Sequence, residues 1–309
     1  MKKAIVTGAN GFVGQYLVNE LIEANYFVYA VIRKRGVFNT RFEWNDRIRV
    51  VELNLDEYSK LPEYIEEEID AFFHLAWQGS AGSDRQNIPL QLKNVEWTCD
   101  AIKASHKLGC LNFIGAGSIM ELETFKAVYA QRNKPGAAYI YGAAKQSAHS
   151  MGKALAASLQ MDFKWAMITN AYGPGETSPR FINTTIRKMI NREPLQFTSG
   201  TQNYDFIYVE DVAKAFIHIS EKGVPYKYYV IGSNQAQALR NYIKRMGETL
   251  APDQTLHFGD VPFTGINLSL EEFDSSDIRN DTGFECDVDF ESGVQKTYEW
   301  IKEMYDSQV

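Results

Sequence analysis

A glycine-rich segment near the start of the printed sequence constrains the fold more than any other feature. The apolar run 3–7 leads into Gly8, Gly11 and Gly14, and an amphipathic stretch over 12–23 follows at once. Glycines placed in this way let the chain turn tightly off a strand, let backbone N–H groups approach phosphates, and let a helix pack closely with its N-terminus toward the anion. The segment therefore predicts a loop that binds the pyrophosphate of a dinucleotide.

Two other interpretations of this segment compete with a dinucleotide loop. One is a purely structural turn, and the other is a nucleoside-triphosphate loop, which ends in Gly-Lys followed by Ser or Thr. The second is excluded because Gly14 is followed by Gln15 and Tyr16. The residues of this loop that we expect to contact the cofactor are Gly8, Asn10, Gly11, Phe12, Val13 and Gly14.

Composition and charge exclude several classes of protein. The chain has 309 residues, of which 45% are hydrophobic and 23% charged, and its formal net charge is −7. An acidic chain without a dense basic run has no general attraction for nucleic acid or anionic membranes. There is no leader pattern and no run of roughly 20 apolar residues, so we expect a cytoplasmic protein with no membrane partner. Cys99, Cys110 and Cys286 are too scattered for a disulfide framework or a metal site, and we expect core thiols.

Apolar, β-rich runs alternate with helical patterns through the first half of the chain. The strand-like runs are 4–7, 27–32, 49–53, 71–76, 113–116 and 165–169. This alternation predicts an α/β fold with a Rossmann-type doubly wound parallel sheet that is covered on both faces. After about residue 170, glycine and proline separate shorter elements. We expect an NAD(P)-binding domain over 1–169, with 205–234 returning to the sheet, and a smaller mixed substrate-binding lobe over 170–204 and 235–309.

The residue that distinguishes NAD from NADP is expected roughly 20 positions beyond the glycines, at the end of the second strand. Arg33 occupies this place and is followed by Lys34 and Arg35, whereas no acidic residue occurs between Glu23 and Glu43. A guanidinium can bind a 2′-phosphate bidentately, while free ribose hydroxyls would need a carboxylate. Arg33 therefore favours NADP over NAD, although a solvated basic turn is the alternative.

The main chemical signal is Tyr141, which is followed four residues later by Lys145. On a helix these positions share a face, so the ammonium is expected to lower the pKa of the phenol toward working pH. Tyr141 could then exchange a proton with a sugar or alcohol oxygen. The spacing alone is unspecific, because Tyr298 and Lys302 repeat it in a terminal amphipathic stretch. Tyr141 is favoured because it follows the fifth strand and begins a helical stretch rich in small residues, 142–159.

Several segments together give the chain a family resemblance. They are, in order, 7–14, 73–77, Asn94 with Val95, Gly117 with Ser118, Tyr141 with Lys145, 170–175 and 205–211. With these segments spread along nearly its full length, the chain resembles the extended short-chain dehydrogenase/reductases. This family comprises nucleotide-sugar epimerases, dehydratases and reductases.

The resemblance implies roles for individual residues. It implies that Ser118 holds the substrate oxygen, that Tyr141 is the acid/base, and that Lys145 both tunes Tyr141 and binds the nicotinamide ribose. The further residues expected at the cofactor are Asn54, Leu55, Leu75, Ala76, Trp77, Asn94 and Asn170. Asn170 is also expected to contact substrate.

Departures from the family pattern narrow the reaction. Dehydratases of the family place an Asp-Glu pair just after the hydroxyl residue, but Ser118 is followed by Ile119 and Met120, which cannot transfer protons. A dehydratase is therefore disfavoured. Glu121 comes one place later, and it could be either a loop carboxylate or a substrate contact.

Recognition of a substrate diphosphate must also differ from that of many relatives. Where these carry an Arg-Asp pair, this chain has Tyr204 and Asp205. The candidate cations are Arg180, Arg187 and Arg240, and Arg180 is the best placed because it follows the glycine- and proline-rich loop. We expect Arg180 and Tyr204 at the substrate.

These features predict an NADP(H)-dependent reductase of a 4-keto-(6-deoxy)hexose nucleotide. An NAD-dependent 4-epimerase is the alternative, because the same groups can remove and return a hydride, and a catalytically silent NADP-sensing interaction protein is a third reading. The family resemblance also implies a homodimer formed by the helices around 94–107 and 141–159. Small residues on the second helix would allow close approach, but they could equally serve packing within one subunit: Ala143, Ala144, Ala148, Gly152 and Ala156.

Overall fold

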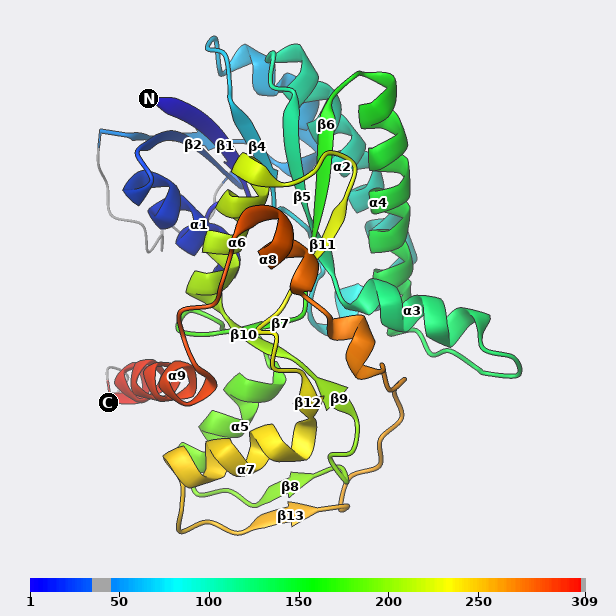
Figure 1. The fold of residues 1–309 in the computed structure, drawn as a ribbon, viewed down its shortest axis with the longest axis vertical. Coiled ribbons are helices and arrows are strands. Elements are labelled where there is room, and N and C mark those ends of the chain that lie inside the picture. The colour runs from blue at the N-terminus through cyan, green and yellow to red at the C-terminus, as the bar shows by residue number, and fades with distance from the viewer. Residues whose placement is uncertain (35–45, 307–309) are drawn as a thin grey trace.

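A seven-stranded parallel sheet forms the centre of the protein in the computed structural model, which describes residues 1–34 and 46–306 (Figure 1). The strand order is β3-β2-β1-β4-β5-β6-β11, which reverses direction between β1 and β4. Ligands of such sheets bind at this reversal, beyond the carboxyl ends of the strands. The strands are β1 (Lys2–Thr7), β2 (Tyr26–Ile32), β3 (Ile48–Glu52), β4 (Ala71–His74), β5 (Asn112–Ser118), β6 (Asp162–Ile168) and β11 (Tyr228–Ile231).

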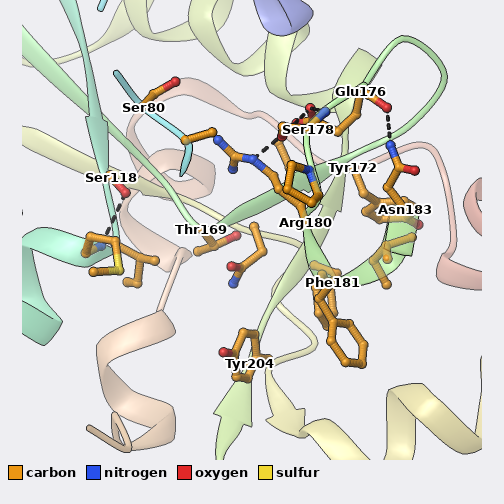
Figure 2. A pocket seen from close by; sticks show the side chains of 18 of the residues that line it. Ser80, Ser118, Thr169, Tyr172, Glu176, Ser178, Arg180, Phe181, Asn183 and Tyr204 are labelled. Atoms are coloured by element: carbon orange, nitrogen blue, oxygen red, sulfur yellow. Dashed lines mark hydrogen bonds and ion pairs between the residues drawn. The ribbon is translucent and has the colours of Figure 1, made fainter. Parts of the chain in front are cut away.

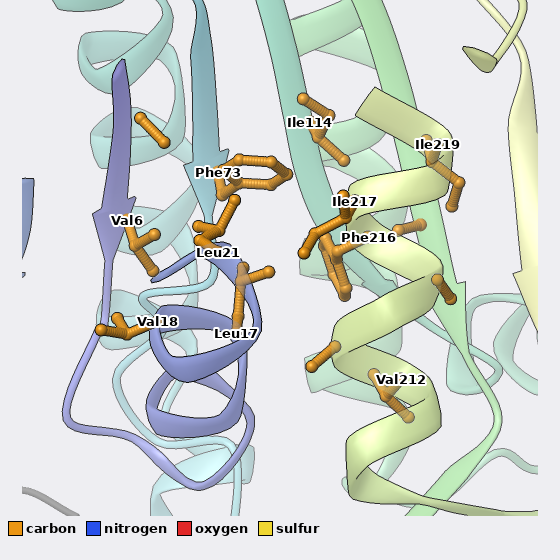
Figure 3. Packing of buried hydrophobic residues seen from close by; sticks show 14 of the residues in the cluster. Val6, Leu17, Val18, Leu21, Phe73, Ile114, Val212, Phe216, Ile217 and Ile219 are labelled. Carbon is orange, nitrogen blue, oxygen red and sulfur yellow. The ribbon is translucent and has the colours of Figure 1, made fainter. Parts of the chain in front are cut away.

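Helices cover both faces of the sheet, because its central strands are apolar on both sides. One face packs on α1 (Phe12–Glu23) and α6 (Val209–Lys222), and Figure 3 shows Leu17 and Phe216 of these helices meeting strand residues such as Phe73. The other face packs on the helices α2 (Ile88–Lys107) and α4 (Tyr139–Ser158) and on the 3₁₀ segment η1 (Leu55–Glu63). The predicted Rossmann-type α/β fold is therefore confirmed.

A smaller lobe lies below the carboxyl ends of the strands (Figure 1). Its core is rich in aromatic side chains, among them Phe206, Tyr242 and Phe290. Its helices are α5 (Phe181–Ile190), α7 (Leu239–Leu250) and α9 (Phe290–Asp306), and its short strands pair as β7 (Asn170–Tyr172) with β10 (Phe206–Tyr208), β9 (Asn203–Tyr204) with β12 (Gln237–Ala238), and β8 (Leu195–Phe197) with β13 (Leu256–Phe258). The remaining elements are η2 (Gly82–Gln86), α3 (Met120–Tyr129), η3 (Leu270–Phe273) and α8 (Ser276–Thr282).

The structure differs from the sequence-based expectations in a few local details. Helix α4 begins at Tyr139, two residues before Tyr141, which was expected to begin the helix. Of the three cysteines, which are all free, only Cys110 is fully buried; Cys99 and Cys286 are partly exposed, and Cys286 packs against the core. No helix in residues 1–34 and 46–306 combines the length and apolar character that a bilayer-spanning segment requires.

Candidate active site

Two cavities meet at Tyr141. The first, which we call the glycine-loop cavity, has a volume of about 530 Å³ and lies at the carboxyl ends of β1, β2 and β4. The second, the lobe cavity, has a volume of about 310 Å³ and is lined by residues of both the sheet and the smaller lobe (Figure 2). Tyr141 lines both cavities, so one phenol faces two adjoining binding spaces.

The glycine loop is packed so closely that two of its glycines leave no room for a side chain. Gly8 has a φ of 71°, and a Cβ there would lie 2.9 Å from the backbone of Ala76. A Cβ on Gly14 would lie 2.1 Å from the carbonyl oxygen of Gly8. The Gly11 N–H donates to that same carbonyl over 2.9 Å. Close packing of backbone on backbone thus leaves N–H groups at the start of α1 facing the cavity, which fits a pyrophosphate.

Most of the residues expected at the cofactor line this cavity. All six loop residues do so, and the others are Arg33, Leu55, Leu75, Ala76, Trp77 and Lys145. Arg33 lies beyond the end of β2, as its sequence position requires, and is exposed. Arg35, which follows it in the basic turn, falls outside the described residues.

Three residues expected at the cofactor do not line the glycine-loop cavity. Asn54 caps η1, where its backbone N–H donates to the carboxylate of Glu57 over 3.2 Å. Asn94 is buried behind the cavity, and its amide braces the backbone of Gln78 through two hydrogen bonds of 2.8 and 2.9 Å. Asn170 lines the lobe cavity instead. Asn94 thereby holds the segment that follows β4, and a direct cofactor contact stays a prediction for it and for Asn54.

Ser118, Tyr141 and Lys145 come together as the sequence predicted, although not with the expected partners. Ser118 ends β5 and lines the lobe cavity beside Tyr141. The ammonium of Lys145 donates to the carbonyl oxygen of Ala116 over 2.8 Å and lies 3.7 Å from the ring centre of Trp77. The Trp77 ring in turn meets the Tyr141 ring edge-on, with centroids 6.0 Å apart.

The electrostatics of this group correct one expectation. Burial raises the pKa of Tyr141, whereas Arg180, Arg85 and the Ser118 hydroxyl lower it. Lys145 is not among the groups that lower it, and burial reduces the pKa of Lys145 itself to about 7. The prediction that Lys145 brings the phenol pKa below its usual value is therefore wrong for this arrangement, because both side chains are withdrawn from water, at 8% and 4% exposure.

The residues expected at the substrate all line the lobe cavity: Ser118, Tyr141, Asn170, Arg180 and Tyr204. Arg180 lies beside Glu176, with 3.2 Å between guanidinium and carboxylate (Figure 2). The other two candidate arginines are elsewhere. Arg187 donates to Asn183 over 2.7 Å and packs over Tyr305, and Arg240 lies over Phe258.

Glu121 belongs to the protein interior rather than to the cavity. It lies on α3 at 2% exposure and does not line the lobe cavity. Its carboxylate accepts the backbone N–H of Ser118 over 2.9 Å and the indole N–H of Trp165 over 3.0 Å, and it lies 3.4 Å from a ring nitrogen of His149. Of the two roles that the sequence left open for Glu121, a loop carboxylate or a substrate contact, the structure supports a structural role. Glu121 lies on a helix, however, and not in a loop.

Sequence reasoning missed three charged residues of the lobe cavity: Glu176, which directly follows the segment 170–175, and the two residues Arg85 and Glu123. Arg85 reaches it from η2, and Glu123 reaches it from α3. Neither belongs to a recognisable motif, and each lies in a segment that the sequence places far from Tyr141. Their position could be found only from the packing of η2 and α3 against α4.

Comparison with known proteins decides the family. The profile that describes the NAD dependent epimerase/dehydratase family matches residues 4–232, well over half of the chain. The chain belongs to this family. The resemblance inferred from the sequence to the nucleotide-sugar epimerases, dehydratases and reductases is confirmed.

Members of the epimerase/dehydratase family match the chain from end to end at low identity. CDP-abequose synthase of Salmonella muenchen is 23% identical over 301 residues, which cover 96% of each chain. Among solved structures, UDP-glucose 4-epimerase of Thermotoga maritima, crystallised with UDP-glucose, superposes with a TM-score of 0.80 at 21% identity and covers 98% of this chain and 99% of its own. The Bordetella bronchiseptica enzyme WbmF, crystallised with NADH, gives a TM-score of 0.78 at 22% identity and covers 99% and 93%. These structures show the same fold.

Proposed function

We propose that the protein is an oxidoreductase that acts on the sugar of a nucleotide sugar with a bound nicotinamide dinucleotide, and that reduction of a 4-keto-(6-deoxy)hexose is its reaction. The observation that carries the proposal is the position of Tyr141 at the junction of the two cavities. A cofactor seated on the glycine loop and a sugar in the lobe cavity would both reach the same phenol.

The residues present fit a dinucleotide. Side chains at Gly8 or Gly14 would collide with backbone, so the cradle is kept open for phosphates. Arg33 lines the far end of the cavity, where a 2′-phosphate could pair with a guanidinium. This supports NADP over NAD. Solved structures of two relatives, WbmF and the UDP-glucuronic acid 4-epimerase of Bacillus cereus, contain NAD or NADH, so the preference needs direct measurement.

Each side chain at the junction then has a task. A bound nicotinamide supplies or accepts the hydride. Tyr141 donates its phenol proton to the sugar oxygen that gains negative charge during reduction, and the hydroxyl of Ser118 donates a hydrogen bond to the same oxygen. The high pKa of the buried phenol suits this acid role, because Tyr141 stays protonated until the oxygen needs the proton. Lys145 fixes the wall between the cavities through Ala116 and Trp77.

The runner-up is an NAD-dependent 4-epimerase, which the solved relatives favour. The Thermotoga and Bacillus proteins are both 4-epimerases of nucleotide sugars. CDP-abequose synthase, whose name indicates synthesis of a deoxysugar, favours the reductase. Several curated relatives are named dTDP-glucose 4,6-dehydratases, but Ile119 and Met120 of this chain cannot transfer protons, which disfavours a dehydratase.

A direct assay separates these reactions. Purified protein is incubated with NADPH or NADH and a panel of 4-keto-6-deoxyhexose nucleotides, and oxidation of the reduced cofactor is followed by absorbance. The reductase predicts faster oxidation of NADPH than of NADH. Interconversion of intact sugar nucleotides without net cofactor oxidation would instead establish the epimerase. Absence of both reactions, with NADPH still bound, would support the silent sensor.

We also infer a homodimer that forms through α2 and α4. The small residues Ala144, Ala148 and Ala156 are buried within the subunit, so they serve internal packing rather than the interface. The outer side of the same two helices exposes Ile88, Leu92 and Met151. These apolar side chains support the pairing. Light scattering should give twice the mass of 35.1 kDa, and Leu92→Lys with Met151→Lys should give the monomer.

We further propose a cytoplasmic location, because the free thiols are consistent with a reducing compartment.

A further inference from the structure

Arg85 has an unusual position relative to the phenol of Tyr141. It belongs to η2, a short segment between β4 and α2 that packs against α4. From there its guanidinium lies over the Tyr141 ring, 4.6 Å from the ring centre. A cation over the face of an aromatic ring is attracted by the ring's negative face, and the attraction increases if the ring gains charge.

The charge of Arg85 is not cancelled by a carboxylate. Among the hydrogen bonds and ion pairs of the described residues, none involves its guanidinium, and its Nε is buried without a hydrogen-bond partner. Glu123 is the acidic group in its vicinity. Burial raises the pKa of Glu123 to about 7, with Arg85 opposing the rise, so this carboxyl is partly neutral near pH 7. The Tyr141 ring, 4.6 Å away, is therefore a close neighbour of a cation that no carboxylate of the described residues pairs with.

The other two cations near the phenol of Tyr141 each have another interaction partner. The ammonium of Lys145 donates to Ala116 and faces Trp77 rather than Tyr141. Arg180, which also lines the cavity, lies 3.2 Å from the carboxylate of Glu176. Arg85 alone among these three combines direct ring contact with the absence of a carboxylate partner within the described part of the chain.

We propose that Arg85 is a positioning residue that stabilises the phenolate that Tyr141 becomes each time it gives up its proton. The tuning of the tyrosine, which the family resemblance assigns to the helix lysine, would then come from an arginine that approaches from the substrate side. This deepens the proposed function, because it concerns the residue taken there as the acid/base.

The balance of charges around Tyr141 gives the direction of the effect. Burial disfavours the phenolate, and so does Glu121 from α3. Arg180, from the segment ahead of α5, and Arg85, from η2, favour it. A guanidinium stays protonated throughout the accessible pH range, so its stabilisation of the phenolate does not fade as the pH rises, whereas Lys145, with a pKa of about 7, loses its charge. Loss of Arg85 must therefore raise the pKa of Tyr141.

The test reads the ionisation of this one phenol without any substrate. Tyr141 is replaced by 3,5-difluorotyrosine, whose fluorines bring the phenol pKa down toward the neutral range, and the ¹⁹F chemical shift is followed against pH. We expect Arg85→Gln to raise the midpoint by about one pH unit. Arg85→Lys should raise it less, because it keeps a cation while losing the planar contact.

Arg192→Gln is the matched control, because Arg192 lies on the surface in an ion pair with Asp253. It should leave the midpoint unchanged. Far-ultraviolet circular dichroism verifies that each variant is folded. A midpoint in Arg85→Gln equal to that of the parent would overturn the proposal. Because the titration needs no turnover, a shifted midpoint in a protein that oxidises no NADPH would refute the proposed reaction and leave the role of Arg85 standing.

Discussion

The two cavities that meet at Tyr141 share lining residues such as Ser80 and Arg180, but their remaining walls differ in kind. One wall of the glycine-loop cavity is formed by the segment 8–14, in which Gly8 and Gly14 pack against main chain, and the rest of its lining comes from segments spread over residues 31–180. The lobe cavity is lined by side chains from segments far apart in the sequence, including Arg85, Ser118 and Tyr204. A backbone cradle accepts any ligand with the same phosphates, whereas a side-chain wall selects one substrate. We therefore expect the glycine loop to set which cofactor binds and the lobe cavity to set which substrate binds.

The largest effect is expected where the two cavities join. Tyr141→Phe removes the proton donor but keeps the ring that packs against Trp77, so turnover should fall by about 10²- to 10⁴-fold while NADPH affinity is kept. Stopped-flow assays and fluorescence titration measure the two quantities. Tyr298→Phe, in the second Tyr-x-x-x-Lys pair on α9, should change neither. Equal turnover by the parent and by Tyr141→Phe would contradict the proposal that the two cavities form one active site at Tyr141.

A change confined to the backbone cradle tests the first half of the comparison. Gly14→Ala places a methyl group 2.1 Å from the Gly8 carbonyl oxygen, so the loop must shift. Strain of about 3 kcal/mol corresponds to roughly 100-fold weaker binding of both NADPH and NADH. Gly136→Ala is the control, because nothing lies within 4 Å of the added Cβ. Unchanged affinity in Gly14→Ala would mean that the loop does not hold the dinucleotide.

A side chain at the edge of the same cradle should affect only one cofactor. Arg33→Ser removes the guanidinium expected at the 2′-phosphate, and loss of one charge-assisted contact of about 1.5 kcal/mol should weaken NADPH binding roughly tenfold. NADH binding should stay nearly the same. Calorimetric titration with both cofactors measures the ratio. If NADH binds the parent protein more tightly than NADPH, the preference inferred from Arg33 is wrong and the epimerase gains support.

Stability at the wall between the cavities should depend on pH. The pKa of Lys145 is about 7 in the folded protein and 10.5 ordinarily, so between these values the unfolded chain binds more protons. The free energy of unfolding of the parent should therefore rise with pH from about 7 to 10 relative to that of Lys145→Met, by about 1 kcal/mol per pH unit. Urea denaturation at pH 7 and pH 9 measures it. Lys153→Met, an exposed change on the same helix, is the control, and its free energy of unfolding should change with pH as that of the parent does.

Local patterns predicted the parts of the site that depend on neighbouring residues. The glycine spacing located the cradle, and the strand alternation located the edge at which it lies. The pair Tyr141 and Lys145 was found because four residues make one turn of a helix. Their chemistry was predicted less well, since the degree of burial sets the pKa of each group and depends on what packs around α4.

The sequence by itself determined the family, the Rossmann-type sheet and the identity of the central tyrosine, because these follow from short-range spacing and hydrophobic alternation. Only the tertiary structure decided that Arg180 faces the cavity while Arg187 and Arg240 do not, that Glu121 is buried, and that Arg85 lies over Tyr141. The physical reason is that a charged side chain acquires its partners from elements that are distant along the chain, and their approach is fixed by the packing of the whole molecule.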